Sequence, residues 1–174
     1  MTVKHQSSTV VANADAVPAV VNNVGAGAAG NLREVTGSVV LTASQDADST
    51  VRFVRVPTNA KIKQVRLDNQ AQTDGDMAFG VYYPTTGPTA KADLAANAIN
   101  VDFFADAVAL DSIIQPTDIT NQNAENTIDL WNQPLWQALG LASDPGGYFD
   151  IVGTVTGAIT TGTGIVGISV AYVE

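Results

Sequence analysis

Alternating apolar and polar residues mark most of this chain as β-strand. In the segment GIVGISVAYV every second residue from Val166 to Tyr172 is apolar, and Gly, Ser and Ala lie between them. Successive side chains of a strand point to opposite faces, so this pattern predicts a strand with one buried face. MAFGVYY alternates in the same way from Met77, and INVDFFA does so from Ile99. We expect a strand at each of these places.

Four further segments are rich in Val, Thr or Ile and are bounded by turn residues, which is typical of short strands. They are residues 35–42, 50–56, 61–67 and 148–156. In the third, Ile62 is out of phase with Val65 and Leu67, which predicts a β-bulge. TIDLW, residues 127–131, predicts one more short strand, and the linker GAITTGTG fits a hairpin connection between the last two strands.

Two segments are candidates for short helices. DAVALDSII, residues 106–114, fits a helix or a strand, and we favour the helix. In QPLWQALG, Pro134 suits the first turn of a helix, and the glycine after Leu139 is placed to end it. Leu135, Trp136 and Leu139 share one face. A helix of hardly two turns is unstable alone, so tertiary or quaternary packing must hold it.

These elements predict an all-β protein, an antiparallel β-sandwich of jelly-roll type with about eight strands and one or two short helices. The long helical crossovers of a parallel sheet are absent from the pattern. Residues 1–33 differ, because they are small, neutral and rich in Gly and Ala, with no clear periodicity. We therefore expect an extended N-terminal arm over residues 1–33 and the sandwich domain over residues 34–174.

The arm carries branched apolar residues that a solvated tail usually lacks. A flexible tail is one interpretation of the segment. The other is an arm that lies along a neighbour, by strand addition or by filling a groove. The predicted contact residues of such an arm are Val10, Val11, Val17, Val20, Val21 and Val24.

Composition and charge narrow the possible partners. The chain is 45% hydrophobic and 14% charged, and its net charge is −9. Much of its surface is therefore neutral, as in proteins covered by neighbours, and direct contact with nucleic acid is not expected because that requires clustered cations. The sequence has one loose group of cations, and we interpret it as the solvated face of two strands. It comprises Arg52, Arg55, Lys61, Lys63 and Arg66. No apolar run is long enough to span a membrane, and no secretion signal is indicated.

The usual catalytic side chains are missing from the sequence. It has no Cys, and its only His is His5, so a thiol nucleophile, a thiolate zinc site and the commonest general base are excluded. Carboxylates could still meet in space, and the candidates are Asp102, Asp106, Asp111 and Asp150. We interpret them as solvated acids on strand faces, and we expect neither catalysis nor a cofactor.

One acidic turn, DNQAQTDGD, offers a weak metal candidate. Its residues Asp68, Asp74 and Asp76 could supply oxygen ligands to a divalent cation. The spacing does not fit a calcium loop, and Asp-Gly is a common hairpin turn. We favour the turn.

With the strands in place, three segments resemble a known class of protein. They are VRFVRVPTNAKIKQVRLDNQAQTDGDMAFGVYYPTTG, INVDFFADAVAL and NQPLWQALGLASDPGGYFDIVGTVT. Over residues 34–174 the chain is similar to small virion proteins of tailed bacteriophages that are encoded beside the major capsid protein and act as head decoration or cement proteins. The resemblance implies a non-enzymatic sandwich, commonly a homotrimer, on the outer surface of the virion. It also implies that the chain is made in the host cytoplasm and that its partners are the major capsid protein and itself.

Two other functions fit the same pattern. One is another virion component, such as a tail, collar or fibre module. The other is a carbohydrate-binding jelly roll that uses Trp131, Trp136 or Tyr148 as a stacking platform. An enzyme with spatially assembled carboxylates is the least favoured.

Both tryptophans of the chain lie close together in LWNQPLWQALGL. We expect Trp131, Leu135, Trp136 and Leu139 to plug one open end of the sandwich. The alternative is that one of the two rings lies at a subunit interface, where Trp is a common anchor.

Overall fold

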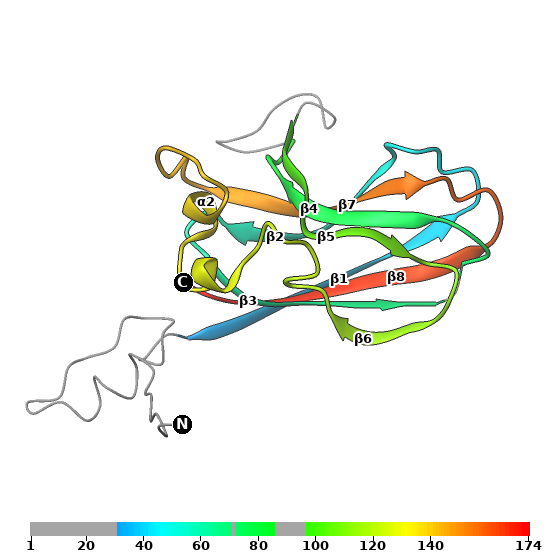
Figure 1. The fold of residues 1–174 in the computed structure, drawn as a ribbon, viewed down its shortest axis with the longest axis horizontal. Helices are drawn as coiled ribbons and strands as arrows, with labels where there is room; N and C mark the ends of the chain where they lie inside the picture. The colour runs from blue at the N-terminus through cyan, green and yellow to red at the C-terminus, as the bar shows by residue number, and fades with distance from the viewer. Residues whose placement is uncertain (1–30, 71, 86–96) are drawn as a thin grey trace, which may run out of the picture.

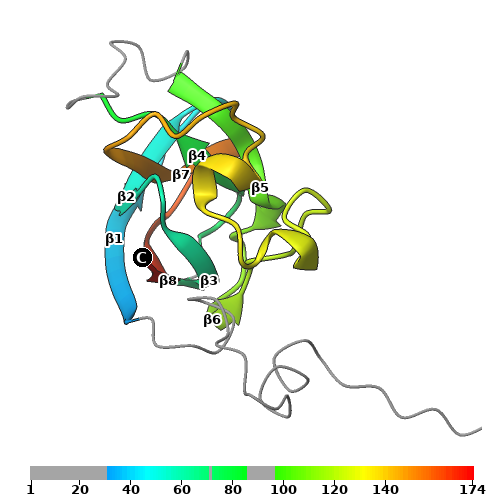
Figure 2. The same cartoon turned by 90° about the vertical axis from the view of Figure 1, so that its left-hand side faces the viewer.

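The computed structural model describes residues 31–70, 72–85 and 97–174, which form two four-stranded antiparallel sheets packed face to face (Figures 1 and 2). The first sheet has the order β1 (Leu32–Thr42), β8 (Thr163–Val173), β3 (Lys61–Asn69), β6 (Ile114–Asp118). The second has the order β2 (Thr50–Pro57), β7 (Tyr148–Gly157), β4 (Asp76–Tyr82), β5 (Ala98–Ala109). The predicted all-β antiparallel sandwich is confirmed.

The strands pair as if one long two-stranded ribbon had been wound up. β1 pairs with β8, β2 with β7, β3 with β6, and β4 with β5, all antiparallel. Successive pairs lie alternately in the first and the second sheet. Each connection other than that from β4 to β5 therefore crosses from one sheet to the other. The hairpin predicted for GAITTGTG is wrong for this reason: β7 and β8 lie in different sheets, and Ile159 in the linker bridges to Gln45 instead.

The core lies between the two sheets and follows the predicted periodicity. The alternate residues of β8 are buried, from Val166 to Tyr172, as the sequence predicts. The predicted bulge in β3 is also present, because the register of β3 against β8 shifts between Ile62 and Gln64. The shift turns Val65 and Leu67 toward the core together with Ile62.

In β4 the burial exceeds what the alternation predicts. Met77, Phe79 and Val81 are buried, but so are the intervening residues. One cause is the close approach of β5: a Cβ atom on Gly80 would lie 2.1 Å from the carbonyl oxygen of Asn100. Glycine is needed here because the backbone of β5 occupies the place of a side chain.

Two predicted elements are wrong. Residues 106–109 do not begin a helix but continue β5, whose Val108 and Ala109 pair with β4, and residues 110–113 lead into β6. Strand pairing with β4 overrides the weak local preference. Residues 127–131 are not a strand either, since they hold the 3₁₀ helix η2 (Ile128–Leu130).

The predicted helix after Pro134 is present as the single turn α2 (Leu135–Ala138), and Gly140 follows it with a positive φ of 72°. Within the described ranges, no helix is long and apolar enough to cross a membrane.

Candidate interaction surfaces

The α2 segment closes one end of the sandwich (Figure 1). The first N–H groups of a helix have no partner within it. Here the turn between β2 and β3 supplies those partners: the Leu135 N–H donates to the Ala60 carbonyl over 2.8 Å, and the Trp136 N–H donates to that of Thr58 over 3.1 Å. The Leu135 side chain is 1% exposed in the core, and Trp136 and Leu139 are half-buried beside it. Both half-buried side chains keep surface that a second molecule can contact.

Trp131 lies apart from this plug. Its side chain is 42% exposed, and its indole Nε1 donates to Asn121 Oδ1 over 3.2 Å. Its carbonyl accepts a hydrogen bond from Lys63 Nζ at 2.9 Å. Burial, with a smaller contribution from the charge of Lys61, lowers the pKa of Lys63. The four residues predicted as one plug therefore divide into a buried anchor, two half-buried neighbours and an exposed ring.

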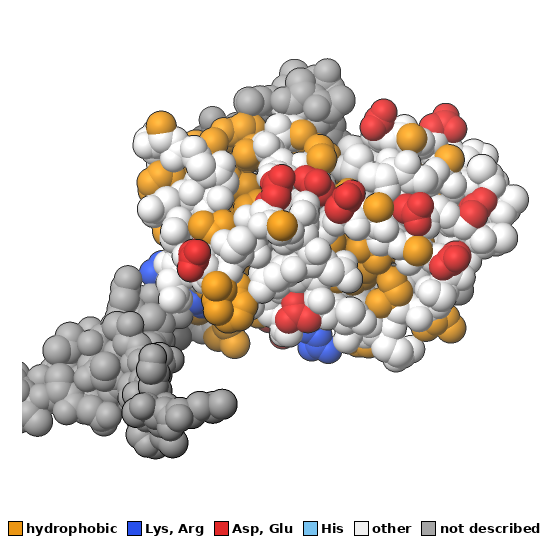
Figure 3. Space-filling model, viewed as in Figure 1, with side chains coloured by type: hydrophobic (Ala, Val, Ile, Leu, Met, Phe, Trp, Pro, Cys, Tyr) orange, Lys and Arg blue, Asp and Glu red, His pale blue; other side chains and the backbone are white. Residues whose placement is uncertain are grey.

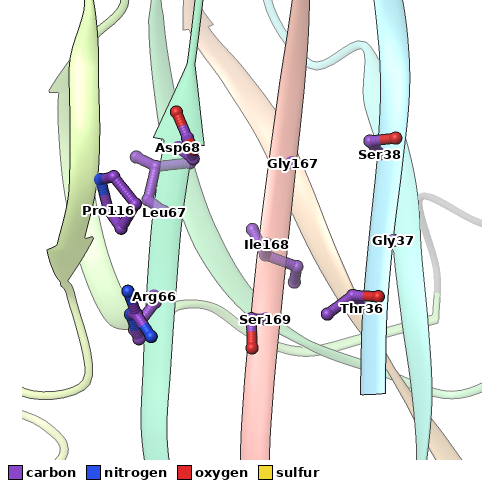
Figure 4. A pocket seen from close by; sticks show the side chains of 10 residues that line it. All are labelled: Thr36, Gly37, Ser38, Arg66, Leu67, Asp68, Pro116, Gly167, Ile168 and Ser169. Carbon is purple, nitrogen blue, oxygen red and sulfur yellow. The ribbon is translucent and has the colours of Figure 1, made fainter. Parts of the chain in front are cut away.

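A shallow hollow of about 350 Å³ lies on the outer face of the first sheet (Figure 4). Its floor is β8, where Gly167 and Ser169 leave room above the backbone. Its sides are β1 on one flank, with Thr36 and Ser38, and on the other flank β3 and β6, the latter through Pro116. The lining is small and mostly uncharged, with Arg66 and Asp68 on the β3 flank as the charged exceptions.

The hollow continues along β8 toward more apolar surface. A second depression shares Ser38, Asp68 and Gly167 with the first and extends it to Ile165. Ile165 is directly opposite Val40 of β1 in the strand register. Ile165 is 42% exposed and Val40 is 55% exposed. We call the two depressions along β8, together with the outward-facing pair of Val40 and Ile165, the β8 groove.

A cluster that the sequence did not predict lies on the second sheet. Arg52 donates to Asp150 Oδ2 from Nε over 2.6 Å, and Arg55 donates to Oδ1 from Nε over 2.7 Å. The Asp150 side chain is only 2% exposed. Arg52 also reaches Thr85, its Nη1 donating to the hydroxyl over 2.6 Å. The hydrogen bond to Asp150 raises the pKa of Arg55.

This cluster corrects the view that Arg52, Arg55 and Asp150 are solvated strand residues. Residues three apart in a regular strand point to opposite faces. The register of β2 against β7 shifts at Phe53, between Arg52 and Val54, and this bulge brings both arginines to the face that carries Asp150. The sequence shows the residues but not the bulge. Because the Asp150 carboxylate is buried and hydrogen-bonded to both arginines, we interpret the cluster as structural.

The three aspartates of the weak metal candidate lie in different surroundings. Asp68 lines the β8 groove. Asp74 Oδ1 accepts the Thr160 N–H over 3.0 Å, and the Thr160 hydroxyl donates to Oδ2. The Thr160 hydroxyl bond is the main reason that the pKa of Asp74 is lowered. Asp76 lies against Gly157. Among residues 31–70, 72–85 and 97–174, no group of three or more His, Cys, Asp or Glu side chains could hold a metal ion.

The predicted contact valines of the arm lie outside the described residues, so their role stays a prediction. They are Val10, Val11, Val17, Val20, Val21 and Val24. The described chain joins this segment at the start of β1, where Leu32 is exposed.

Comparisons with known proteins give one distant likeness. No protein-family model matches the sequence, and no curated protein matches it. A chain in the solved cyanophage Pam1 capsid asymmetric unit is similar, with 16% identity and a TM-score of 0.49, over 91% of this chain and 96% of that one. A likeness at this level carries no conclusion about function.

Proposed function

We propose that this chain is a non-enzymatic virion structural protein that decorates and cements a bacteriophage capsid shell. The β8 groove is the observation that carries the proposal. It is an exposed sheet face with small neutral residues at its centre and an apolar pair at one end. Such a face suits a flat polypeptide contact, in which backbone and small side chains approach closely. The resemblance of residues 34–174 to head decoration proteins agrees with that use.

We also infer that the fold is a jelly roll. The pairing of β1 with β8, β2 with β7, β3 with β6 and β4 with β5 is what a wound two-stranded ribbon produces. Eight strands in two such sheets are typical of jelly rolls, which include viral capsid and lectin domains. This inference supports a virion role but does not separate it from carbohydrate binding.

In the proposed assembly the chain lies on the outer surface of the shell as a homotrimer, and its partners are the major capsid protein and sister subunits. The valine-bearing arm would bind a neighbour. Repeated copies on a shell strengthen modest individual contacts, so each groove contact need not be tight.

The test uses heads that lack the chain, to which purified protein is added back. We expect wild-type protein to co-sediment with the heads and to raise the temperature at which they lose DNA. Gly167→Leu should abolish both effects, because its Cβ fits at 3.4 Å from Ser38 while the rest of the side chain fills the groove. Thr156→Leu, at an exposed position on β7, is the matched control and should behave as wild type.

Heads that are equally stable with and without the chain would contradict a cementing role. Immunogold labelling of the tail alone would favour a tail, collar or fibre module instead.

Carbohydrate binding is the second candidate, because two aromatic side chains remain exposed. Trp131 is 42% exposed and Tyr148 is 49% exposed. Exposed aromatic rings can stack on sugar faces. A glycan array with reproducible binding that is lost in Trp131→Ala would support this function, and an array without binding would remove it.

A further inference from the structure

The side of the sandwich opposite β1 and β2 ends in the edge strands β5 and β6. Large apolar side chains are unusually exposed along it. Ile113 is 65% exposed and Ile128 is 69% exposed, and Val101 and Trp131 are each 42% exposed. Exposed apolar side chains that gather on one side of a soluble protein can mark an interaction site.

Hydrogen bonds hold the segment that precedes η2 against β5. Asn123 Nδ2 donates to the Asp102 carbonyl over 2.8 Å, and the Asn123 N–H donates to that of Phe104 over 3.0 Å. The amide of Asn100 in β5 bonds to the Glu125 carboxylate. We call the exposed side chains between Ala98 and Trp131, on this side of the sandwich, the β5 strip.

The strip's own ionisable side chains are acidic, and the cations beside it come from β3, where Lys63 reaches Trp131 and Arg66 lies near Asp118. No Lys, Arg or His follows Lys91 in the sequence, so every ionisable side chain of the strip that is charged at neutral pH is acidic. Asp106, Asp111, Glu125 and Asp129 are all exposed there. Figure 3 shows acidic and apolar side chains interspersed over this face, with Lys and Arg at its left and lower margins.

A second copy of the chain is a poor match for this surface, because each copy carries a net charge of −9. Four of its eight Lys and Arg residues also take part in contacts within its own fold. Arg33 pairs with Glu174, Arg52 and Arg55 hold Asp150, and Lys63 binds the Trp131 carbonyl. Nucleic acid is excluded by the shared negative charge.

The strip combines carboxylates with exposed apolar side chains, so its complement is a surface of opposite charge that is also apolar. We therefore propose that the β5 strip binds a different protein, whose contact surface combines Lys or Arg with apolar side chains. Ile113 and Ile128 supply the apolar contact, and the surrounding carboxylates pair with the partner's cations. Rim charges of this kind steer association and select the partner more than they add affinity. The proposal concerns different residues from the β8 groove and does not depend on the groove's occupant.

The probes are three short labelled peptides: one alternating Lys and Leu, one alternating Lys and Ser, and one alternating Glu and Leu. Fluorescence anisotropy of each with the full chain should show binding only for Lys/Leu. Asp111→Asn with Asp129→Asn should weaken that binding roughly three- to tenfold at low salt, and less at high salt. Asp46→Asn with Asp48→Asn makes the same change in net charge on the β1–β2 connection and should change binding less than about twofold.

A second pair of variants tests the contribution of the apolar side chains to binding. Ile128→Ser should weaken Lys/Leu binding, whereas Leu32→Ser, at a side chain that is 66% exposed on β1, should not. Equal weakening by both charge pairs, or by both serine variants, would overturn the proposal. So would a change in the self-association of the chain in Ile128→Ser, measured by sedimentation equilibrium, because the occupant would then be a second copy.

Discussion

Arg55 Nε donates a hydrogen bond to Oδ1 of Asp150 over 2.7 Å, joining β2 to the most deeply buried carboxylate of the described chain. The contact depends on the bulge at Phe53, which places Arg52 on the same face. A buried carboxylate is tolerated when its charge is compensated and its oxygens are hydrogen-bonded. Here both conditions are met by two guanidinium groups.

Replacing Asp150 should therefore destabilise the fold. In Asp150→Ala the two guanidinium groups lose their acceptor, and we expect the free energy of unfolding to fall by about 2–4 kcal/mol, somewhat less than for a fully buried pair because both arginines are partly exposed. Urea denaturation measures the change. The exposed Asp106→Ala is the control and should lie within about 0.5 kcal/mol of wild type. A similar value for both variants would show that the cluster is not structural.

Around α2, the structure predicts an order of stability effects. Leu135→Ala should cost about 2–5 kcal/mol, because it opens a cavity in the core. Trp136→Ala should cost less, since its ring is only half-buried, and Trp131→Ala should be nearly neutral. Thermal and urea denaturation of the three variants would establish the order. If Trp131→Ala proved the most destabilising, the division of this segment into anchor and exposed ring would be wrong.

Gly37 on β1 and Gly167 on the neighbouring strand β8 should differ in how much stability is lost when each is replaced by alanine. A Cβ at Gly37 would lie 2.2 Å from the Phe53 carbonyl oxygen, whereas at Gly167 the nearest atom would be 3.4 Å away. We expect Gly37→Ala to cost about 1–3 kcal/mol, because backbone must move. Gly167→Ala should change stability little. Denaturant midpoints with unchanged slopes would confirm the contrast, and equal losses would contradict it.

Acid should weaken the contact between Asp74 and Thr160. The pKa of Asp74 is lower in the folded chain than its ordinary value, mainly through the Thr160 hydroxyl. The charged carboxylate therefore contributes stability above its unfolded pKa, and this contribution is lost as the pH falls through the folded pKa. Asp74→Asn should be less stable than wild type near pH 7, and the two curves should converge as the pH falls below the folded pKa of Asp74. A constant difference over that range would contradict the assignment.

The sequence predicts the strands best where burial is one-sided. The alternation from Val166 to Tyr172 and the phase slip at Ile62 both have direct counterparts in the structure. In such segments the position of each apolar side chain is itself the evidence, because a one-residue slip would expose the whole set.

The errors arise where the pairing partner decides the structure. Residues 106–109 carry no strong helix or strand signal, and only their partners in β4 make them a strand. The linker before β8 has hairpin composition, but β8 pairs with β1 and β3 instead of β7. Local sequence does not encode which strand will be the neighbour.

The candidate surfaces, too, could be predicted only where the local sequence marks them and not where neighbouring strands create them. Leu135 and its neighbours stand out in the sequence because both tryptophans of the chain lie in this segment. The β8 groove cannot be recognised in the sequence, because Gly167 and Ser169 look like ordinary outward-facing residues. Only the placement of β1, β3 and β6 around them forms the groove. The acidic sign of the β5 strip can be read from the sequence, but its apolar exposure cannot.

The pairing of β1 with β8 places Leu32 opposite Val173. Among the strands that the structure describes, β1 pairs only with β8, which is synthesised more than a hundred residues later. Contacts this distant along the chain are associated with slow folding. Until β8 is made, the described part of β1 has no strand to pair with, so the closure of that one ladder joins the two ends of the sandwich domain last.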